Sequence, residues 1–137
     1  MNYTILALIA YILWTMLLLL SLAGFRTFYN KANNRKSLKF DASGNDVGGF
    51  GERLTRAHAN CYESFVFVAG PMIVALATGS AAITNGLAIY MILARLAQSI
   101  VHIASVANIA IILRFVFFLV QFGIAAYWLI LLLQKFA

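Results

Sequence analysis

The amino-acid sequence predicts an all-α integral membrane protein, a bundle of four transmembrane helices. The chain of 137 residues is 64% hydrophobic and only 10% charged. Its mean hydropathy is +0.91, and long apolar stretches reach the roughly 20 residues that a helix needs to cross about 30 Å of hydrocarbon. An ordinary soluble domain is far less apolar, so these observations exclude a soluble fold.

Four segments are predicted to span the membrane within a single domain. The first, residues 4–24, is uncharged and lacks a basic region ahead of it, which indicates a retained helix and not a secretory signal. The second, 54–77, is polar in its first third. The third, 81–107, is interrupted by one arginine, and the fourth, 109–133, carries Arg114 near its start.

Residues 25–53 form the one sizeable connection, and the basic residues concentrate in or beside it: Arg26, Lys31, Arg35, Lys36, Lys39, Arg53 and Arg56. Only Lys135 marks the opposite side. The positive-inside rule therefore predicts a cytoplasmic loop and extracytoplasmic termini. The net charge of +6 is interpreted as an orientation signal. No nucleic-acid partner is expected, because aromatic residues do not interleave with the cations.

The short chain and short loops favour a bacterial inner membrane, although an endomembrane protein would orient its basic loop in the same way. Cys61 stands alone, so no intrachain disulfide can form, and no Cys or His spacing suggests a structural metal. Pro71 follows Gly70 inside the second span, where its missing amide hydrogen should kink the helix. Trp14 and Trp128 are interpreted as packing or lipid-facing residues.

Ionisable residues at membrane depth usually face a bundle interior or a water-filled cavity, so each is a functional candidate. In the second span Arg53, Arg56, Asn60 and Glu63 recur at i, i+3, i+7 and i+10. At roughly 100° per helical residue they share one face. This spacing predicts a polar stripe that faces the interior of the bundle.

The third span carries a second stripe of the same kind. Arg95, Gln98, Ser99 and His102 are spaced i, i+3, i+4 and i+7. In the predicted topology, Arg114 of the fourth span lies at nearly the depth of His102. Three helices are therefore expected to converge on a cationic pocket near the cytoplasmic face.

Two of these polar residues, Glu63 and Arg95, can also be interpreted as structural and not functional. Glu63 and Arg95 can form a buried ion pair that holds the bundle together. A single carboxylate cannot neutralise all the arginines of the pocket, namely Arg53, Arg56, Arg95 and Arg114. The excess positive charge indicates an anionic ligand.

The motifs resemble those of the MAPEG family, the membrane-associated proteins of eicosanoid and glutathione metabolism. The second span matches that family's second helix in the pattern Arg53-x-x-Arg56-Ala-His-x-Asn60-x-x-Glu63. The pattern Arg95-x-x-Gln98-x-x-x-His102 resembles the family's third helix, and Leu113-Arg114 resembles the start of the family's fourth helix. The resemblance covers essentially the whole chain in length, order and topology.

The resemblance implies a homotrimer that binds glutathione, as a co-substrate and without a metal, between neighbouring protomers. A hydrophobic small-molecule substrate would arrive from the lipid side. In that family, certain residues bind glutathione or shape its pocket. The resemblance implies the same role in this chain for Arg26, Arg53, Arg56, Asn60, Glu63, Arg95, Gln98 and His102. Arg114 matches the catalytic arginine. A guanidinium in a partly dehydrated site stabilises the thiolate nucleophile, and arginine forks suit the two glutathione carboxylates.

The expected function is that of a glutathione-dependent transferase or peroxidase acting on lipophilic electrophiles or lipid hydroperoxides. Prostaglandin isomerase chemistry is not expected, because Gln98, His102 and Phe115 depart from the residues of better-known members. His58 and Tyr62 are interpreted as bystanders at the membrane interface. Two alternatives remain: a non-catalytic lipid-binding or scaffold protein of the same fold, and a small transporter or channel subunit.

Overall fold

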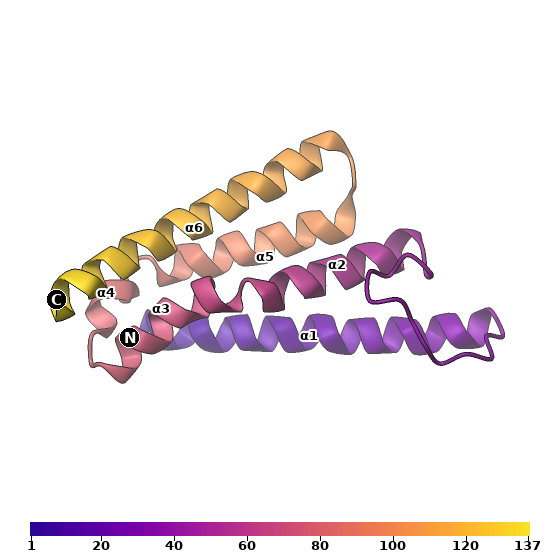
Figure 1. The fold of residues 1–137 in the computed structure, drawn as a ribbon, viewed down its shortest axis with the longest axis horizontal. Helices are drawn as coiled ribbons and strands as arrows, with labels where there is room; N and C mark the ends of the chain where they lie inside the picture. Colours follow the sequence, from indigo (N-terminus) through magenta and orange to yellow (C-terminus); the bar gives the residue numbers. More distant parts are fainter.

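The computed structural model describes residues 1–137 and contains helices but no strands. About 80% of the chain is helical. The helices are α1 Tyr3–Ala32, α2 Gly49–Glu63, α3 Phe65–Ala77, α4 Ala81–Asn85, α5 Ala88–Ala104 and α6 Asn108–Phe136. They lie side by side as an elongated bundle in which α2 and α3 follow one another along α1, and α5 lies between α2 and α6 (Figure 1).

Three helical segments are long and apolar enough to cross a membrane: Tyr3–Ala32, Gly49–Ala77 and Asn108–Phe136. The predicted third span, 81–107, is shorter than expected. The helix that corresponds to it breaks at Gly86 and Leu87, and α5 then ends at Ala104, so that α5 is an apolar helix of 17 residues. At about 1.5 Å per residue it is about 25 Å long, slightly less than the hydrocarbon thickness.

Apolar side chains from alanine to tryptophan fill the interior where α1, α3, α5 and α6 meet. Ala7 and Tyr11 of α1 pack with Met72 of α3, Met91 of α5 and Trp128 of α6, and all are almost fully buried. Trp128 is therefore a packing residue. Many larger apolar side chains on α1 and α6 point outward, which suits helices surrounded by lipid.

The second span is interrupted at Ser64, seven positions before the expected kink at Pro71, and α3 continues through Pro71. The Tyr11 hydroxyl of α1 donates a hydrogen bond to the Cys61 carbonyl. In an unbroken helix that carbonyl would accept from the amide of Phe65, and this bond is absent. A side chain inserted into the helical hydrogen-bond ladder accounts for the break.

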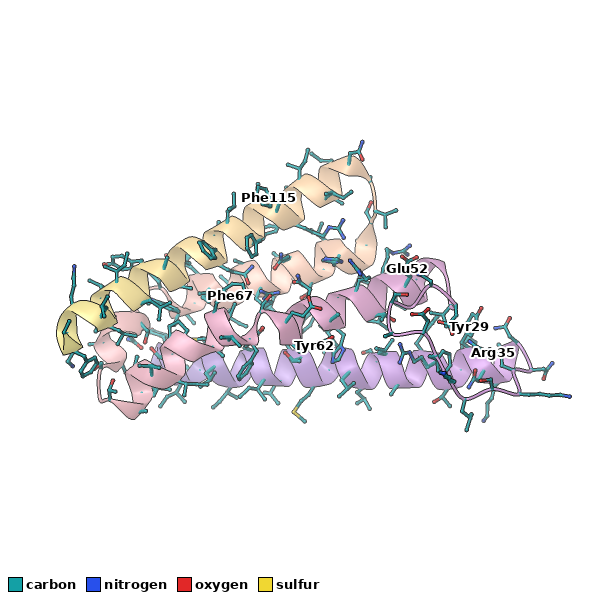
Figure 2. The ribbon with its side chains drawn as sticks, in the orientation of Figure 1. Tyr29, Arg35, Glu52, Tyr62, Phe67 and Phe115 are labelled. Atoms are coloured by element: carbon teal, nitrogen blue, oxygen red, sulfur yellow. The ribbon has the colours of Figure 1, made fainter.

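Both termini lie at one end of the bundle, and residues 33–48 lie at the other end together with the α5–α6 connection (Figure 1). This arrangement suits an even number of crossings; the cytoplasmic placement of the loop remains a prediction. Arg35 holds the loop by an ion pair with Asp46 at 3.2 Å. Arg35 also lies beside the ring of Tyr29 near the end of α1 (Figure 2).

Candidate functional site

Polar side chains gather where one face of α2, the end of α5 and the start of α6 meet. Two adjoining hollows of about 260 and 120 Å³ open there and share Arg56 and His102. We call the two together the polar hollow. Its lining residues are Glu52, Arg53, Arg56, Ala59, Asn60, Glu63, His102, Val106, Ile111 and Arg114.

Arg114 and His102 touch inside the polar hollow. Arg114 Nη1 lies 3.0 Å from His102 Nδ1 and 3.4 Å from Nε2. Because the same guanidinium nitrogen lies close to both ring nitrogens, it lies over the face of the imidazole and not along the in-plane lone pair of either nitrogen. His102 lies in the last turn of α5, and the short connection to α6 brings Arg114 back against it.

Arg53 and Arg56 occupy the same hollow from α2. Arg53 Nε donates to the Ile103 carbonyl at 2.7 Å, so it binds the carboxyl end of α5, where helix carbonyls carry partial negative charge. Arg56 is exposed and makes no hydrogen bond or ion pair within the chain. Arg56 is therefore the guanidinium of the hollow with the most donors free for an anion.

Arg95 lies behind the hollow and does not line it. Its side chain is fully buried, and Nη1 donates to Asn60 Oδ1 at 2.6 Å. The guanidinium carbon lies 5.8 Å from the centre of the Tyr11 ring, and the remaining nitrogens, Nε and Nη2, have no partner. The alternative ion pair with Glu63 is not formed, because the one ion pair of the chain joins Arg35 and Asp46.

Gln98 also faces away from the polar hollow. Its Nε2 donates to the Arg114 carbonyl at 3.0 Å, and its Oε1 accepts from Gln121 Nε2 at 3.0 Å. Gln121 was not among the predicted site residues, although it lies seven residues after Arg114 and therefore on the same face of α6. That spacing was the signal that could have identified it.

The charges of the hollow are more balanced than the sequence predicts, because Glu52 joins Glu63 there. Glu52 lies near the start of α2 (Figure 2). Two carboxylates face the guanidiniums of Arg53, Arg56 and Arg114, which leaves a formal excess of one positive charge, or two with Arg95 included. The hollow still favours an anion, and it offers a carboxylate for an ammonium group as well.

Arg26 is the predicted site residue that lies outside this assembly. It donates to the Asp41 carbonyl at 3.4 Å, and its guanidinium lies 5.1 Å from the centre of the Phe40 ring. Phe115, which follows Arg114, lies on the outer side of α6 with 59% of its surface exposed (Figure 2). The chain therefore brings together six of the nine predicted residues at the hollow, with Arg95 and Gln98 behind it.

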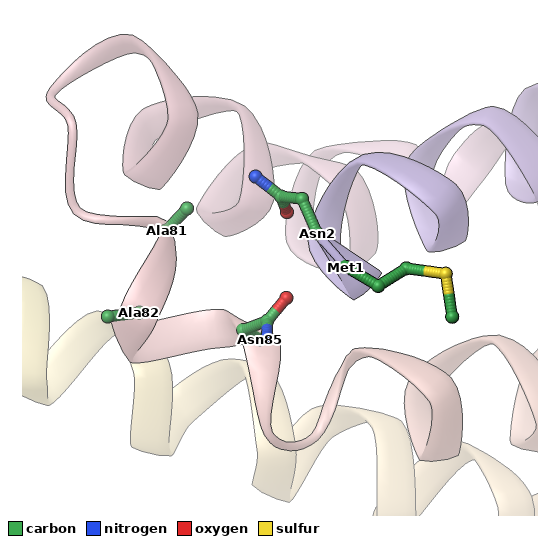
Figure 3. Close-up of a pocket in the computed structure, with 5 residues that line it drawn as sticks. All are labelled: Met1, Asn2, Ala81, Ala82 and Asn85. Atoms are coloured by element: carbon green, nitrogen blue, oxygen red, sulfur yellow. The ribbon is translucent and has the colours of Figure 1, made fainter.

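A second hollow lies at the opposite end of the bundle, between the start of α1 and α4 (Figure 3). It has a volume of about 360 Å³ and is lined by Met1, Asn2, Ala81, Ala82 and Asn85. Asn85 Oδ1 accepts a hydrogen bond from the backbone amide of Thr4 at 3.2 Å, so the Asn85 side chain joins α4 to α1. No ionisable side chain lines this hollow, so it lacks the guanidiniums and carboxylates that gather in the polar hollow.

No group of three His, Cys, Asp or Glu side chains lies close enough to hold a metal ion.

Comparison with known proteins gives one match. A family model described as "MAPEG family" matches residues 4–134. No curated protein and no solved structure matches this chain.

Proposed function

This chain belongs to the MAPEG family, and on that premise we propose that it is a membrane-bound, glutathione-dependent transferase or peroxidase. Its apolar helices and its family make it a multi-pass integral membrane protein. The proposed substrates are lipophilic electrophiles or lipid hydroperoxides.

The contact of Arg114 with His102, in the same hollow as Arg53 and Arg56, carries this proposal. Glutathione has two carboxylates, one ammonium group and one thiol. Arg53 and Arg56 suit its carboxylates, because a guanidinium pairs with a carboxylate through two parallel hydrogen bonds. Glu63 suits the ammonium group. The remaining cation, Arg114, is then available to the sulfur.

In the proposed reaction Arg114 stabilises the thiolate, and the thiol proton leaves to solvent. For conjugation, the sulfur attacks an electrophilic carbon, an S–C bond forms, and the leaving group departs with its electron pair. For peroxide reduction, the sulfur attacks one oxygen of the O–O bond. Attack on the terminal oxygen breaks the O–O bond and gives a sulfenic acid and an alkoxide, which takes a proton from solvent to become the alcohol. A second glutathione then converts the sulfenic acid to a disulfide and water.

The lining of the polar hollow supports a lipophilic second substrate. Val106 and Ile111 bring apolar surface to the side where α5 passes into α6. Val106 is 66% and Ile111 49% exposed, so both border the outer face of the bundle. We propose that the second substrate approaches the sulfur from the membrane across these two residues.

The proposal extends to a homotrimer, which the family resemblance implies, and to a cytoplasmic site in a bacterial inner membrane. Arg26 lies away from the hollow of its own chain, where it contacts Asp41 and Phe40. This placement suits a glutathione site that lies between protomers and draws residues from two chains. Chemical cross-linking of the protein in detergent tests the trimer.

A glutathione titration of the purified protein tests the central step. Thiolate absorbs in the ultraviolet, so a saturable rise in absorbance reports the bound, ionised thiol. We expect the signal in the wild type and in Lys36→Ala, a charge-matched control at an exposed loop position. Arg114→Ala should abolish it. An equal signal from Arg114→Ala would exclude the assigned role, and a protein without any signal would favour a non-catalytic member of the family.

A further inference from the structure

Two buried glutamines form a chain of hydrogen bonds that ends on the backbone of Arg114. Gln121 Nε2 donates to Gln98 Oε1 at 3.0 Å, and Gln98 Nε2 donates to the Arg114 carbonyl at 3.0 Å. Gln121 is fully buried and Gln98 is 3% exposed. Neither side chain lines the polar hollow. These two hydrogen bonds thus join α5 to α6 just behind Arg114.

The orientation of each amide is determined by its partners. Gln121 Nε2 also donates to the Phe117 carbonyl of its own helix at 2.8 Å, so its nitrogen is fixed. This nitrogen requires an acceptor from Gln98, and the NH₂ group of Gln98 must then point at the Arg114 carbonyl. If the Gln98 amide were reversed, its NH₂ group would face the NH₂ group of Gln121, and its oxygen would face the Arg114 carbonyl oxygen. Neither pair could form a hydrogen bond.

Residue 114 is consequently held by α5 at two points. Gln98 binds its backbone carbonyl, and His102, one helical turn further along α5, contacts its guanidinium at 3.0 Å. The first contact sets the rotation and the height of α6 at residue 114. The second sets the direction of the side chain.

We propose that Gln98 and Gln121 are positioning residues, which hold the Arg114 guanidinium in the polar hollow without touching glutathione. This inference rests on the proposed function for its chemical consequence. It revises the sequence-based expectation that Gln98 itself binds glutathione.

A purely structural role is the competing explanation. Interhelical hydrogen bonds in membranes add little net stability, because unfolded helices in the bilayer also find partners. Gln121 Oε1 moreover has no partner at all, which is unfavourable for a buried amide. A leucine would fill the space without that penalty. A glutamine pair is therefore better explained by orientation than by stability.

The test compares Gln98→Leu, Gln121→Leu and the double variant with the wild type. Gln134→Leu is the matched control, since Gln134 is an exposed glutamine near the end of α6. In each protein the thiolate absorbance at saturating glutathione is measured against pH. We expect both single variants to raise the pH midpoint by about 0.5–1 pH unit, which is a threefold to tenfold loss of thiolate stabilisation, with the affinity for glutathione unchanged.

Because the two glutamines act in series, the double variant should lose no more than the single ones. Gln98→His keeps one donor and one acceptor and should retain most of the wild-type signal. Unchanged midpoints in folded variants would overturn the proposal. So would strictly additive losses, which would indicate independent packing effects.

A second measurement separates this inference from the proposed function. The chain has two histidines, so the imidazole NMR spectrum without glutathione contains signals from His58 and His102 only. If the glutamines position Arg114, Gln121→Leu should move the His102 signal toward its place in Arg114→Ala and leave that of His58 unchanged. This result would support the positioning role even in a protein that bound no glutathione. An unmoved His102 signal would contradict it even if glutathione binding were strong.

Discussion

Replacement of Asn60 by leucine should destabilise the bundle, because Asn60 is the one side chain that hydrogen-bonds the fully buried Arg95. The Oδ1–Nη1 distance of 2.6 Å is that of a strong, charge-assisted bond. Arg95 Nε and Nη2 have no partner already. In Asn60→Leu the guanidinium would keep only a long contact with the backbone carbonyl of residue 60, at 3.4 Å, and the face of the Tyr11 ring.

The size of the loss lies between two limits. Hydrogen bonds to charged groups contribute about 1.5–3 kcal/mol in soluble proteins, whereas interhelical hydrogen bonds in membranes average about 0.6 kcal/mol. The Arg95 charge is buried with no other strong partner, so its bond should fall in the upper part of this range. We expect Asn60→Leu to lower the free energy of unfolding by about 2 kcal/mol.

The assay is reversible unfolding in mixed micelles, followed by circular dichroism. Arg95→Met with Asn60→Leu is the informative control, because removing both partners should recover most of the loss. A loss below about 0.5 kcal/mol in the single variant would contradict this expectation. A double variant less stable than the single one would refute it as well.

Three further predictions concern other parts of the chain. Hydrogen bonds to Asp41 from the amide and the hydroxyl of Ser43 hold the pKa of that carboxyl below its usual value. Ser43→Ala should therefore raise the pKa partway in a carboxyl NMR titration. The stabilisation of the loop by this carboxylate is present above the usual pKa and disappears as the pH falls through the lowered one, so the variant loop should loosen at a higher pH. Gly51→Ala should destabilise the protein by about 1–3 kcal/mol in thermal unfolding, because its added Cβ would collide with the Phe25 ring. Arg53→Met should speed hydrogen exchange over the last turn of α5 roughly fivefold to tenfold, since it removes a bond of about 1–1.4 kcal/mol to that turn.

Hydropathy predicted where helices occur better than where they end. The first helix was expected to finish at residue 24, yet α1 continues to Ala32. The length of an apolar run indicates how much of a helix lies in lipid, and not where the helix ends. Phe25 near the end of α1 packs against Tyr29 and Phe50 at 5.9 and 5.5 Å between ring centres, so contacts with the loop end of α2 continue the helix beyond its apolar run.

The interruption of the second span could not be located from that span alone. Pro71 is the local signal, but the break at Ser64 depends on the Tyr11 hydroxyl from a different helix. Nothing in the pattern of residues 54–77 indicates that Tyr11 will take the Cys61 carbonyl. A contact between distant segments determined this feature, as tertiary contacts often do.

For the candidate site, spacing grouped residues on a helix face correctly but left open what each face meets. Arg95, Gln98 and Ser99 are all buried, as a stripe facing inward requires. Gln98 nevertheless faces α6, and Arg95 faces α2 and α1. Periodicity fixes the angle between side chains on one helix, whereas the neighbouring helix is set by the packing of the whole bundle.

The rate of glutathione conjugation to a lipophilic electrophile in proteoliposomes tests the central claim most directly. We expect the wild type and the Lys36→Ala control to turn over at similar rates, and Arg114→Ala to fall by about 10²–10³-fold, as for the loss of one group that stabilises developing charge. Undiminished conjugation by Arg114→Ala would contradict the assignment of the polar hollow as the site of thiolate chemistry.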